Sequence, residues 1–166
     1  MKKLIILRGN SGSGKTTVAR ALQRKIGFNT MLISQDEIRR NILWVKDGID
    51  TKALPLMIEL LKYGNEHSDI VILEGIMYNE WYSSLFNVAN ELYGENVHSY
   101  YFDIPFEETL RRHQTRSKCQ EFGEEHMREW CREKDFSCVL KEELITSEMD
   151  ADWIVEKIYT DLLKDN

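Results

Sequence analysis

The chain has 166 residues, of which 42% are hydrophobic and 30% charged, and its formal net charge at pH 7 is −6. This length suits one domain with its own core, and the acidic balance does not favour nonspecific binding to nucleic acid or to an anionic membrane. No run reaches the length of a membrane-spanning helix, and the first apolar run is too short for a signal-peptide core. We therefore expect a single domain over residues 1–166, located in the cytoplasm.

Short apolar runs alternate along the chain with segments of helical period. Strands are expected at 4–7, 30–33, 70–73, 97–102 and 144–146, and those at 4–7 and 70–73 are expected to be buried. Helices are expected at 15–26, 35–42, 54–66, 79–93, 106–116, 124–133 and from about 150 to the C-terminus. Ser34 and Glu37 have the spacing of a capping box at the start of the second helix. Because strands joined through helices form parallel sheets covered on both faces, we predict one α/β domain.

The segment between the first strand and the first helix fits the P-loop pattern G-x-x-x-x-G-K-[ST]. Its glycines allow successive N–H groups to surround a phosphate, and the following helix directs its positive end toward the anion. Lys15 can reach the outer phosphates and act in catalysis, and Thr16 offers a hydroxyl to Mg²⁺. A flexible turn that matches by chance is the alternative, but the flanking strand and helix favour a phosphate site. The predicted nucleotide-binding residues are Gly9, Asn10, Ser11, Gly12, Ser13, Gly14, Lys15, Thr16 and Thr17.

Acidic residues follow the second and third predicted strands, at the sheet edge where open α/β domains bind their ligands. Asp36 could accept a proton from a substrate hydroxyl as it attacks a terminal phosphate. Its alternative role is that of an acid favoured by the dipole of a helix first turn. Glu74 occupies the place of a Walker B acid and could hold Mg²⁺ through a water, together with Thr16. A strand-end charge that faces solvent is the alternative for Glu74.

Arginines complete the predicted catalytic edge. Arg39 and Arg40 follow Asp36 and could hold the acceptor, although one of them is expected to be only a solvated charge. Arg112 and Arg116 share a helix face and could clamp the transferring phosphoryl group. Arg112 also has the spacing for a local ion pair with a glutamate, whereas Arg116 has no such partner and is the better catalytic candidate.

Residues 117–136 are polar, charged and rich in aromatic side chains, which predicts a lid that excludes water from the phosphates. A surface helix that only packs downward is the alternative. Four aromatic residues could stack on a planar acceptor, although core packing is expected for most of them: Trp44, Tyr78, Trp81 and Tyr82. The three cysteines, Cys119, Cys131 and Cys138, lack a CxxC pair, so we expect free thiols rather than a zinc-bearing flap.

Three motifs carry a resemblance to a known family: the P-loop, Ile-Ser-Gln-Asp-Glu-Ile-Arg-Arg at 33–40 and Leu-Arg-Arg-His-Gln-Thr-Arg at 110–116. They resemble small bacterial P-loop kinases of the nucleoside/nucleotide-kinase-like group, which are often labelled "uridine kinase". The resemblance implies a three-layer sandwich with a five-stranded parallel sheet in the order 2-3-1-4-5, a helical lid and ATP as phosphoryl donor. Phage polynucleotide kinase and chloramphenicol phosphotransferase are more distantly similar, and their acid after the second strand implies Asp36 as general base.

The combined prediction is an ATP- and Mg²⁺-dependent phosphotransferase that acts on a hydroxyl of a small molecule, such as a nucleoside, a similar metabolite or an antibiotic. A 5′-hydroxyl kinase for nucleic acid is the alternative within enzymes. The acidic composition argues against it, as does Gln35, which stands where the phage family has an arginine. A nucleotide-binding regulator, or an ATPase without an acceptor, is the alternative from another class.

Overall fold

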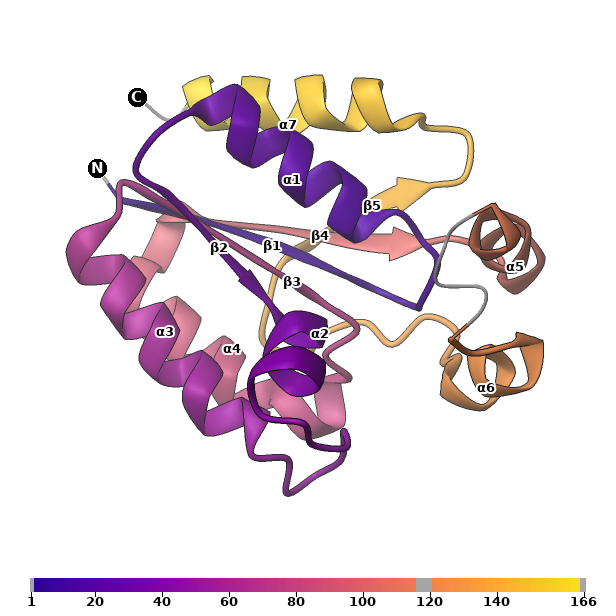
Figure 1. Ribbon diagram of the computed structural model, residues 1–166. Coiled ribbons are helices and arrows are strands. Elements are labelled where there is room, and N and C mark those ends of the chain that lie inside the picture. Colours follow the sequence, from indigo (N-terminus) through magenta and orange to yellow (C-terminus); the bar gives the residue numbers. More distant parts are fainter. Residues whose placement is uncertain (1, 116–120, 165–166) are drawn as a thin grey trace.

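The computed structural model describes residues 2–115 and 121–164. Its centre is a five-stranded parallel sheet in the order β2-β3-β1-β4-β5, which confirms the predicted fold (Figure 1). The strands are β1 (Lys3–Gly9), β2 (Thr30–Ser34), β3 (Ile70–Gly75), β4 (Val97–Asp103) and β5 (Glu142–Thr146).

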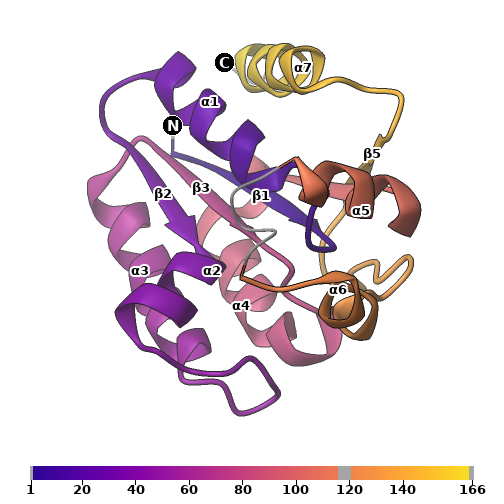
Figure 2. The same cartoon turned by 45° about the vertical axis from the view of Figure 1, so that its right-hand side comes forward.

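Helices cover both faces of this sheet. They are α1 (Lys15–Ile26), α2 (Gln35–Glu37), the π-helix η1 (Ile38–Ile42), α3 (Ala53–His67), α4 (Asn79–Tyr93), the 3₁₀-helix η2 (Gly94–Asn96), α5 (Phe106–Gln114), α6 (Glu124–Trp130) and α7 (Ala151–Lys164). Helices α1 and α7 lie on one face and α3 and α4 on the other, while α5 and α6 lie beyond the carboxyl ends of β1 and β4 (Figures 1 and 2). None of the helices among the described residues is long and apolar enough to cross a membrane.

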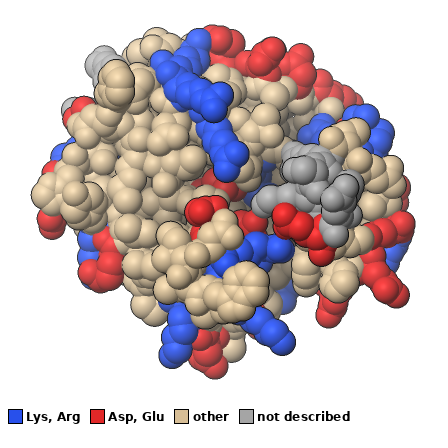
Figure 3. All heavy atoms as spheres, in the orientation of Figure 1, with Lys and Arg blue, Asp and Glu red and all other residues tan. Residues whose placement is uncertain are grey.

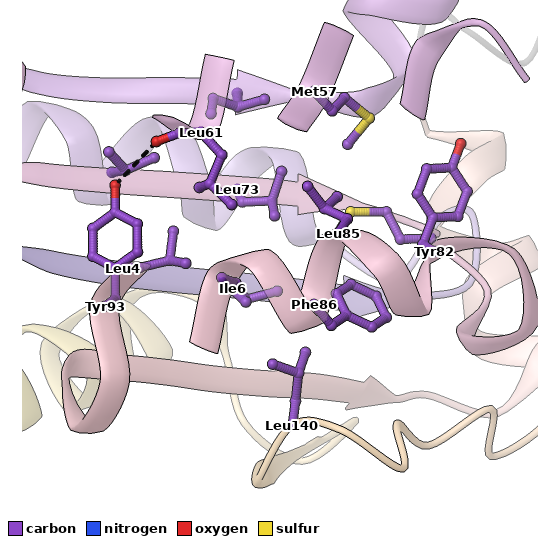
Figure 4. Packing of buried hydrophobic residues seen from close by; sticks show 14 of the residues in the cluster. Leu4, Ile6, Met57, Leu61, Leu73, Tyr82, Leu85, Phe86, Tyr93 and Leu140 are labelled. Carbon is purple, nitrogen blue, oxygen red and sulfur yellow. Dashed lines mark hydrogen bonds between the residues drawn. The ribbon is translucent and has the colours of Figure 1, made fainter. Parts of the chain in front are cut away.

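The central strand β1 divides its side chains between two hydrophobic cores. Leu4 and Ile6 join the core under α3 and α4, whose packing is shown in Figure 4. Ile5 and Leu7 join the core under α1 and α7. Because successive side chains of a strand point to opposite faces, a continuous apolar run is what a strand buried on both faces requires.

The predicted capping box at the second helix is wrong. No side chain caps α2, because the Ser34 hydroxyl donates instead to a carboxylate oxygen of Glu74 on the neighbouring strand. The helix then continues as η1, a π-helix, rather than as regular α-helix. π-Helices are rare in proteins, and those that occur are often found at functional sites. Helix η1 carries Arg39 and Arg40.

Two helices end earlier than their sequence patterns predict. Helix α5 ends at Gln114, and the Thr115 hydroxyl donates to the backbone carbonyl of Arg112 at 2.8 Å, a local bond that competes with helix continuation. Helix α6 ends at Trp130 rather than at residue 133, because the N–H and C=O of Arg132 bond to the side chain of Asn10 and not to the helix ladder. Arg116 lies outside the described residues.

Candidate active site

The segment from β1 to α1 has the backbone geometry of a phosphate-binding loop. Gly9, Gly12 and Gly14 have φ angles of 144°, 77° and 101°, a region that favours glycine. A Cβ on Gly9 would lie 2.8 Å from the carbonyl oxygen of Phe102, and one on Gly12 would lie 2.6 Å from that of Thr109. The loop therefore requires glycine for its shape and for its close approach to neighbouring backbone.

The loop's lysine is held across its own turn. The Lys15 ammonium donates to the Asn10 carbonyl oxygen at 2.7 Å and to the Ser13 hydroxyl at 3.1 Å. Helix α1 follows directly, and its first turn carries neither an acidic residue nor a side-chain cap. Its N-terminal N–H groups and positive dipole end therefore favour an anion here, as the P-loop pattern predicts.

Glu74 at the end of β3 is buried next to this loop. Its side chain accepts a hydrogen bond from the Thr16 hydroxyl at 3.2 Å and another from the Ser34 hydroxyl. Glu74 is 2% exposed, so the interpretation of Glu74 as a solvated strand-end charge is wrong. A hydroxyl and a carboxylate beside a phosphate loop are oxygen ligands of the kind that Mg²⁺ prefers.

Asp36, Arg39 and Arg40 form one cluster. The Asp36 Oδ1 atom accepts from Arg40 Nε at 2.6 Å and from Arg39 Nη2 at 3.3 Å. The side chains are 37%, 19% and 29% exposed, respectively, so all three are partly shielded from water. Neither arginine is a solvated surface charge, because both orient the same carboxylate.

A cavity of about 680 Å³ joins these groups. Residues of the phosphate loop, α2, η1, β3, α4 and the segments 76–78 and 121–136 line it, including Lys15, Thr16, Asp36, Arg39, Arg40, Glu74, Tyr78, Trp81, His126, Trp130 and Arg132. The predicted base, metal-binding and acceptor-binding residues therefore surround a single space with the P-loop lysine.

Arg112 lies beside the phosphate loop but outside this cavity. Its Nη1 donates to the Ser13 carbonyl oxygen at 3.0 Å, and its Nε donates to Glu108 at 2.8 Å. Hydrogen bonds from Arg111 and Arg112 lower the pKa of Glu108 to about 2. Arg112 also borders a second hollow of about 200 Å³, which Thr17, Phe102 and Met149 help to line.

The described part of the predicted lid, residues 121–136, both packs downward and lines the cavity. Met127 is 2% exposed beneath α6. Phe122 stacks on His113 with the ring centroids 4.6 Å apart and contacts Trp130 edge-on at 5.2 Å. The guanidinium of Arg40 lies 5.2 Å from the centre of the Phe122 ring, so the lid touches the cluster around Asp36.

A polar network in the wall of the cavity has no signal in the sequence. Gln35 donates to the Tyr82 hydroxyl at 2.7 Å and to Asp47 at 3.0 Å, and the Tyr82 hydroxyl donates to Asp47 at 2.7 Å. Burial, reinforced by the Asp47 charge, raises the pKa of the Tyr82 hydroxyl. The network joins α2 to α4 and to the segment before α3, and it accounts for Tyr82 as a structural residue, whereas Trp44 is exposed.

Arg8, which directly precedes the phosphate loop, was also not singled out by its sequence pattern. Its side chain is fully buried and donates to Asp135 at 2.9 Å, to Glu142 at 2.6 Å and to the Met77 carbonyl oxygen at 2.9 Å. A charged residue within an apolar strand does not reveal which residues it pairs with. Here Asp135 lies near the C-terminal end of the predicted lid and Glu142 lies on β5.

The cysteines form no metal site among the described residues, where no group of three or more His, Cys, Asp or Glu side chains could hold a metal ion. Cys131 and Cys138 are free thiols, and burial raises the pKa of Cys131. Cys119 lies outside the described residues.

The fold and the loop define a P-loop NTPase-like domain. Residues 4–134 match the family model described as an AAA domain, and the chain belongs to this family. A search of curated proteins finds no match.

Three kinases are among the solved structures that share the fold. The gluconokinase from Sinorhizobium meliloti 1021 has 14% identity and a TM-score of 0.64, with 98% of this chain and 92% of that chain covered. The Mycobacterium tuberculosis APS kinase CysC in complex with AMPPNP and APS has 18% identity and a TM-score of 0.64, with 98% of each chain covered. The shikimate kinase from Acinetobacter baumannii in complex with shikimate has 21% identity and a TM-score of 0.63, with 100% of this chain and 96% of that chain covered.

Proposed function

We propose that the chain is a kinase that transfers the γ-phosphate of ATP to a hydroxyl group of a small molecule. The observation that carries this proposal is the cavity of about 680 Å³, which the Asp36 carboxylate and the phosphate loop both line. An ATPase without an acceptor has no need of a carboxylate oriented by two arginines next to the phosphates. The 680 Å³ volume is in the range of small-molecule sites.

The residues divide the reaction between them. Asp36 accepts the proton of the acceptor's hydroxyl group while the hydroxyl oxygen bonds to the γ-phosphorus of ATP. The bond between the γ-phosphorus and the oxygen that bridges it to the β-phosphate breaks, which leaves ADP. Lys15 and the loop N–H groups neutralise the phosphate charge. Thr16 and Glu74 would hold Mg²⁺, which when bound offsets the negative charge that develops on the phosphate oxygens.

The second hollow offers a place for the base of the nucleotide. It borders the same phosphate loop and has apolar walls from Phe102 and Met149. Arg112 lies at its edge, where a guanidinium could stack on a planar base. On this interpretation Arg112 contacts the donor rather than the acceptor.

The names of the three similar structures support a small acceptor, since they are kinases of gluconate, APS and shikimate. Charge argues against a nucleic acid. On the face shown in Figure 3, the basic side chains form one short ridge over α1, and elsewhere they are scattered among acidic ones. A nucleoside, as the likeness to proteins labelled "uridine kinase" implies, is one member of the small-molecule class.

The proposal is tested by incubating the protein with γ-labelled ATP, Mg²⁺ and separate pools of nucleosides, sugar acids, hydroxy acids, aminoglycosides and a 5′-hydroxyl oligonucleotide. We expect label on a small molecule of one pool. Label on the oligonucleotide alone would favour the nucleic-acid alternative. Slow release of phosphate with no labelled acceptor would favour an ATPase or a regulator.

Replacing Glu74 with Gln is expected to raise the Mg²⁺ concentration needed for tight ATP binding by about 10- to 100-fold. The amide keeps the shape and can still accept from Thr16, but it loses the charge. Calorimetric titration with ATP at a series of Mg²⁺ concentrations measures this change. Binding without Mg²⁺ is the control and should be little altered. An unchanged Mg²⁺ dependence would remove Glu74 from the metal site.

A further inference from the structure

The side chain of Asn10 connects the phosphate loop to the segment that follows α6. Its Nδ2 donates to the Arg132 carbonyl oxygen at 2.8 Å, and the Arg132 N–H donates to its Oδ1 at 3.0 Å. Asn10 is only 8% exposed, so little water competes for these bonds. One amide thus binds both peptide groups of a residue 122 positions away.

The side chain of Arg132 is held in turn against a wall of the cavity. Its guanidinium carbon lies 4.0 Å from the centre of the Tyr78 ring and 4.8 Å from that of Trp81. Its Nη1 also lies 3.2 Å from Glu80. All three stacked residues line the cavity of about 680 Å³, so this stack, Arg132 on Tyr78 and Trp81, forms part of its surface. A cation on two ring faces is a favourable and oriented arrangement.

Tyr78 strengthens the connection to the lid. Its hydroxyl donates to the Trp130 carbonyl oxygen, and burial raises its pKa to about 12. The C-terminal end of α6 is therefore bound on one side to the stack and on the other to the phosphate loop.

Asn10 also lies where a phosphate bound in the loop would affect its backbone. Its own carbonyl oxygen accepts from the Lys15 ammonium at 2.7 Å and from the Ser13 N–H at 3.4 Å. A phosphate that binds the loop N–H groups and the Lys15 ammonium would fix the loop backbone. The main chain of Asn10, and with it the amide that holds Arg132, would then be fixed as well.

We propose that Asn10 is a positioning residue that transmits occupancy of the phosphate loop to Arg132 and its stack. Binding of the donor nucleotide thereby orders the wall against which the acceptor lies. This interpretation rests on the proposed function only where it assigns that wall to the acceptor. Because such coupling is reciprocal, a ligand that orders the stack raises the affinity for the nucleotide by a certain factor, and the nucleotide raises the affinity for that ligand by the same factor.

The test measures hydrogen exchange of residues 130–138 with and without saturating AMPPNP and Mg²⁺. In the unaltered protein, the nucleotide is expected to slow exchange in this segment by about tenfold, the equivalent of one to two hydrogen bonds made more persistent. Asn10→Ala, measured at an AMPPNP concentration that saturates the variant, should lose this effect. Asn10→Asp keeps the acceptor for the Arg132 N–H but loses the donor, so it should retain part of the effect and serves if the alanine variant does not fold.

Asn79→Ala is the matched control. Asn79 holds the same segment, since its Oδ1 accepts from the Cys138 N–H at 3.2 Å, but it comes from α4 and not from the phosphate loop. This variant should speed exchange in the absence of nucleotide and keep the slowing by AMPPNP. If Asn10 were only a general tether of this segment, the two variants would change hydrogen exchange in the same way. A relay from the loop predicts that Asn10→Ala abolishes the slowing by AMPPNP and that Asn79→Ala does not.

The outcomes separate this inference from the proposed function. Slowed exchange that depends on Asn10, with no acceptor ever labelled, would support the relay and contradict the kinase. A labelled acceptor, with exchange that AMPPNP leaves unchanged or that Asn10→Ala does not alter, would overturn the relay and keep the kinase. Failure of the unaltered protein to bind AMPPNP would overturn both the relay and the kinase.

Discussion

Asp36→Asn is expected to lower the rate of phosphoryl transfer by about 10²- to 10⁴-fold, the range found for loss of a general base. The amide has nearly the same size and keeps an oxygen for Arg40 Nε, which lies 2.6 Å from the carboxylate. It cannot take a proton from a hydroxyl at neutral pH. Affinity for ATP should stay within about twofold, because an interaction made only in the transition state does not contribute to ground-state binding.

Glu37→Gln is the control for this prediction. Glu37 is the adjacent residue of the same short helix, but it is exposed and its carboxylate accepts from Asn41 rather than from the cluster around Asp36. Label transfer and calorimetric ATP binding are measured on both variants with the acceptor identified from the pools. Normal transfer by Asp36→Asn would show that Asp36 is only a helix-start acid. A loss of ATP affinity instead would assign it to the donor site.

The parts of this site that could be predicted are those whose signal is local. The P-loop residues are adjacent in sequence, and the strand before them is a run of apolar residues that needs no partner to be recognised. Asp36 and Glu74 could be found because each lies at or just after the C-terminal end of a strand, and parallel strands bring such positions to one edge. The register that pairs Ser34 with Glu74 confirms this placement.

The parts that could not be predicted depend on contacts between distant segments. Ser34 and Glu37 fit the local rule of a capping box, yet a tertiary acceptor on β3 takes the Ser34 hydroxyl. The early end of α6 likewise depends on Asn10, whose partner Arg132 has no marker of its own in the sequence. Polar side chains have many potential partners, and only the completed fold selects among them.

Arg8 provides the second large expected effect, a loss of stability. Arg8→Met is expected to lower the free energy of unfolding by about 3–5 kcal/mol, measured by urea denaturation. The guanidinium is fully buried, and its partners Asp135 and Glu142 have side chains only 18% and 4% exposed. Removing the cation leaves their charges in a poorly hydrated place with fewer hydrogen bonds.

Arg8 also holds backbone that is unfavourable by itself. Met77 and Lys134 have φ angles of 45° and 50°, which non-glycine residues adopt at a cost of about 1–3 kcal/mol where the surroundings enforce them. The Met77 carbonyl oxygen accepts from Arg8 Nη2 at 2.9 Å, and Lys134 precedes the Asp135 that pairs with it. Loss of Arg8 therefore removes support from both turns as well as a partner from two acids.

Two further variants distinguish a stranded charge from lost packing. Lys62→Met removes an exposed cation from its 2.8 Å pair with Glu59 and should change stability by less than about 0.5 kcal/mol. Arg8→Met combined with Glu142→Gln removes the more deeply buried acid together with the cation and should recover about 1–2 kcal/mol relative to Arg8→Met alone. If the double variant is no more stable, the loss arises from the packing of Arg8 between Phe86 and Tyr101, whose ring centres lie 4.9 and 5.6 Å from its guanidinium.

If Arg8→Met itself costs less than about 1 kcal/mol, the buried pairs are not a main support of the fold, because breaking such a pair from one side is normally among the costliest single changes.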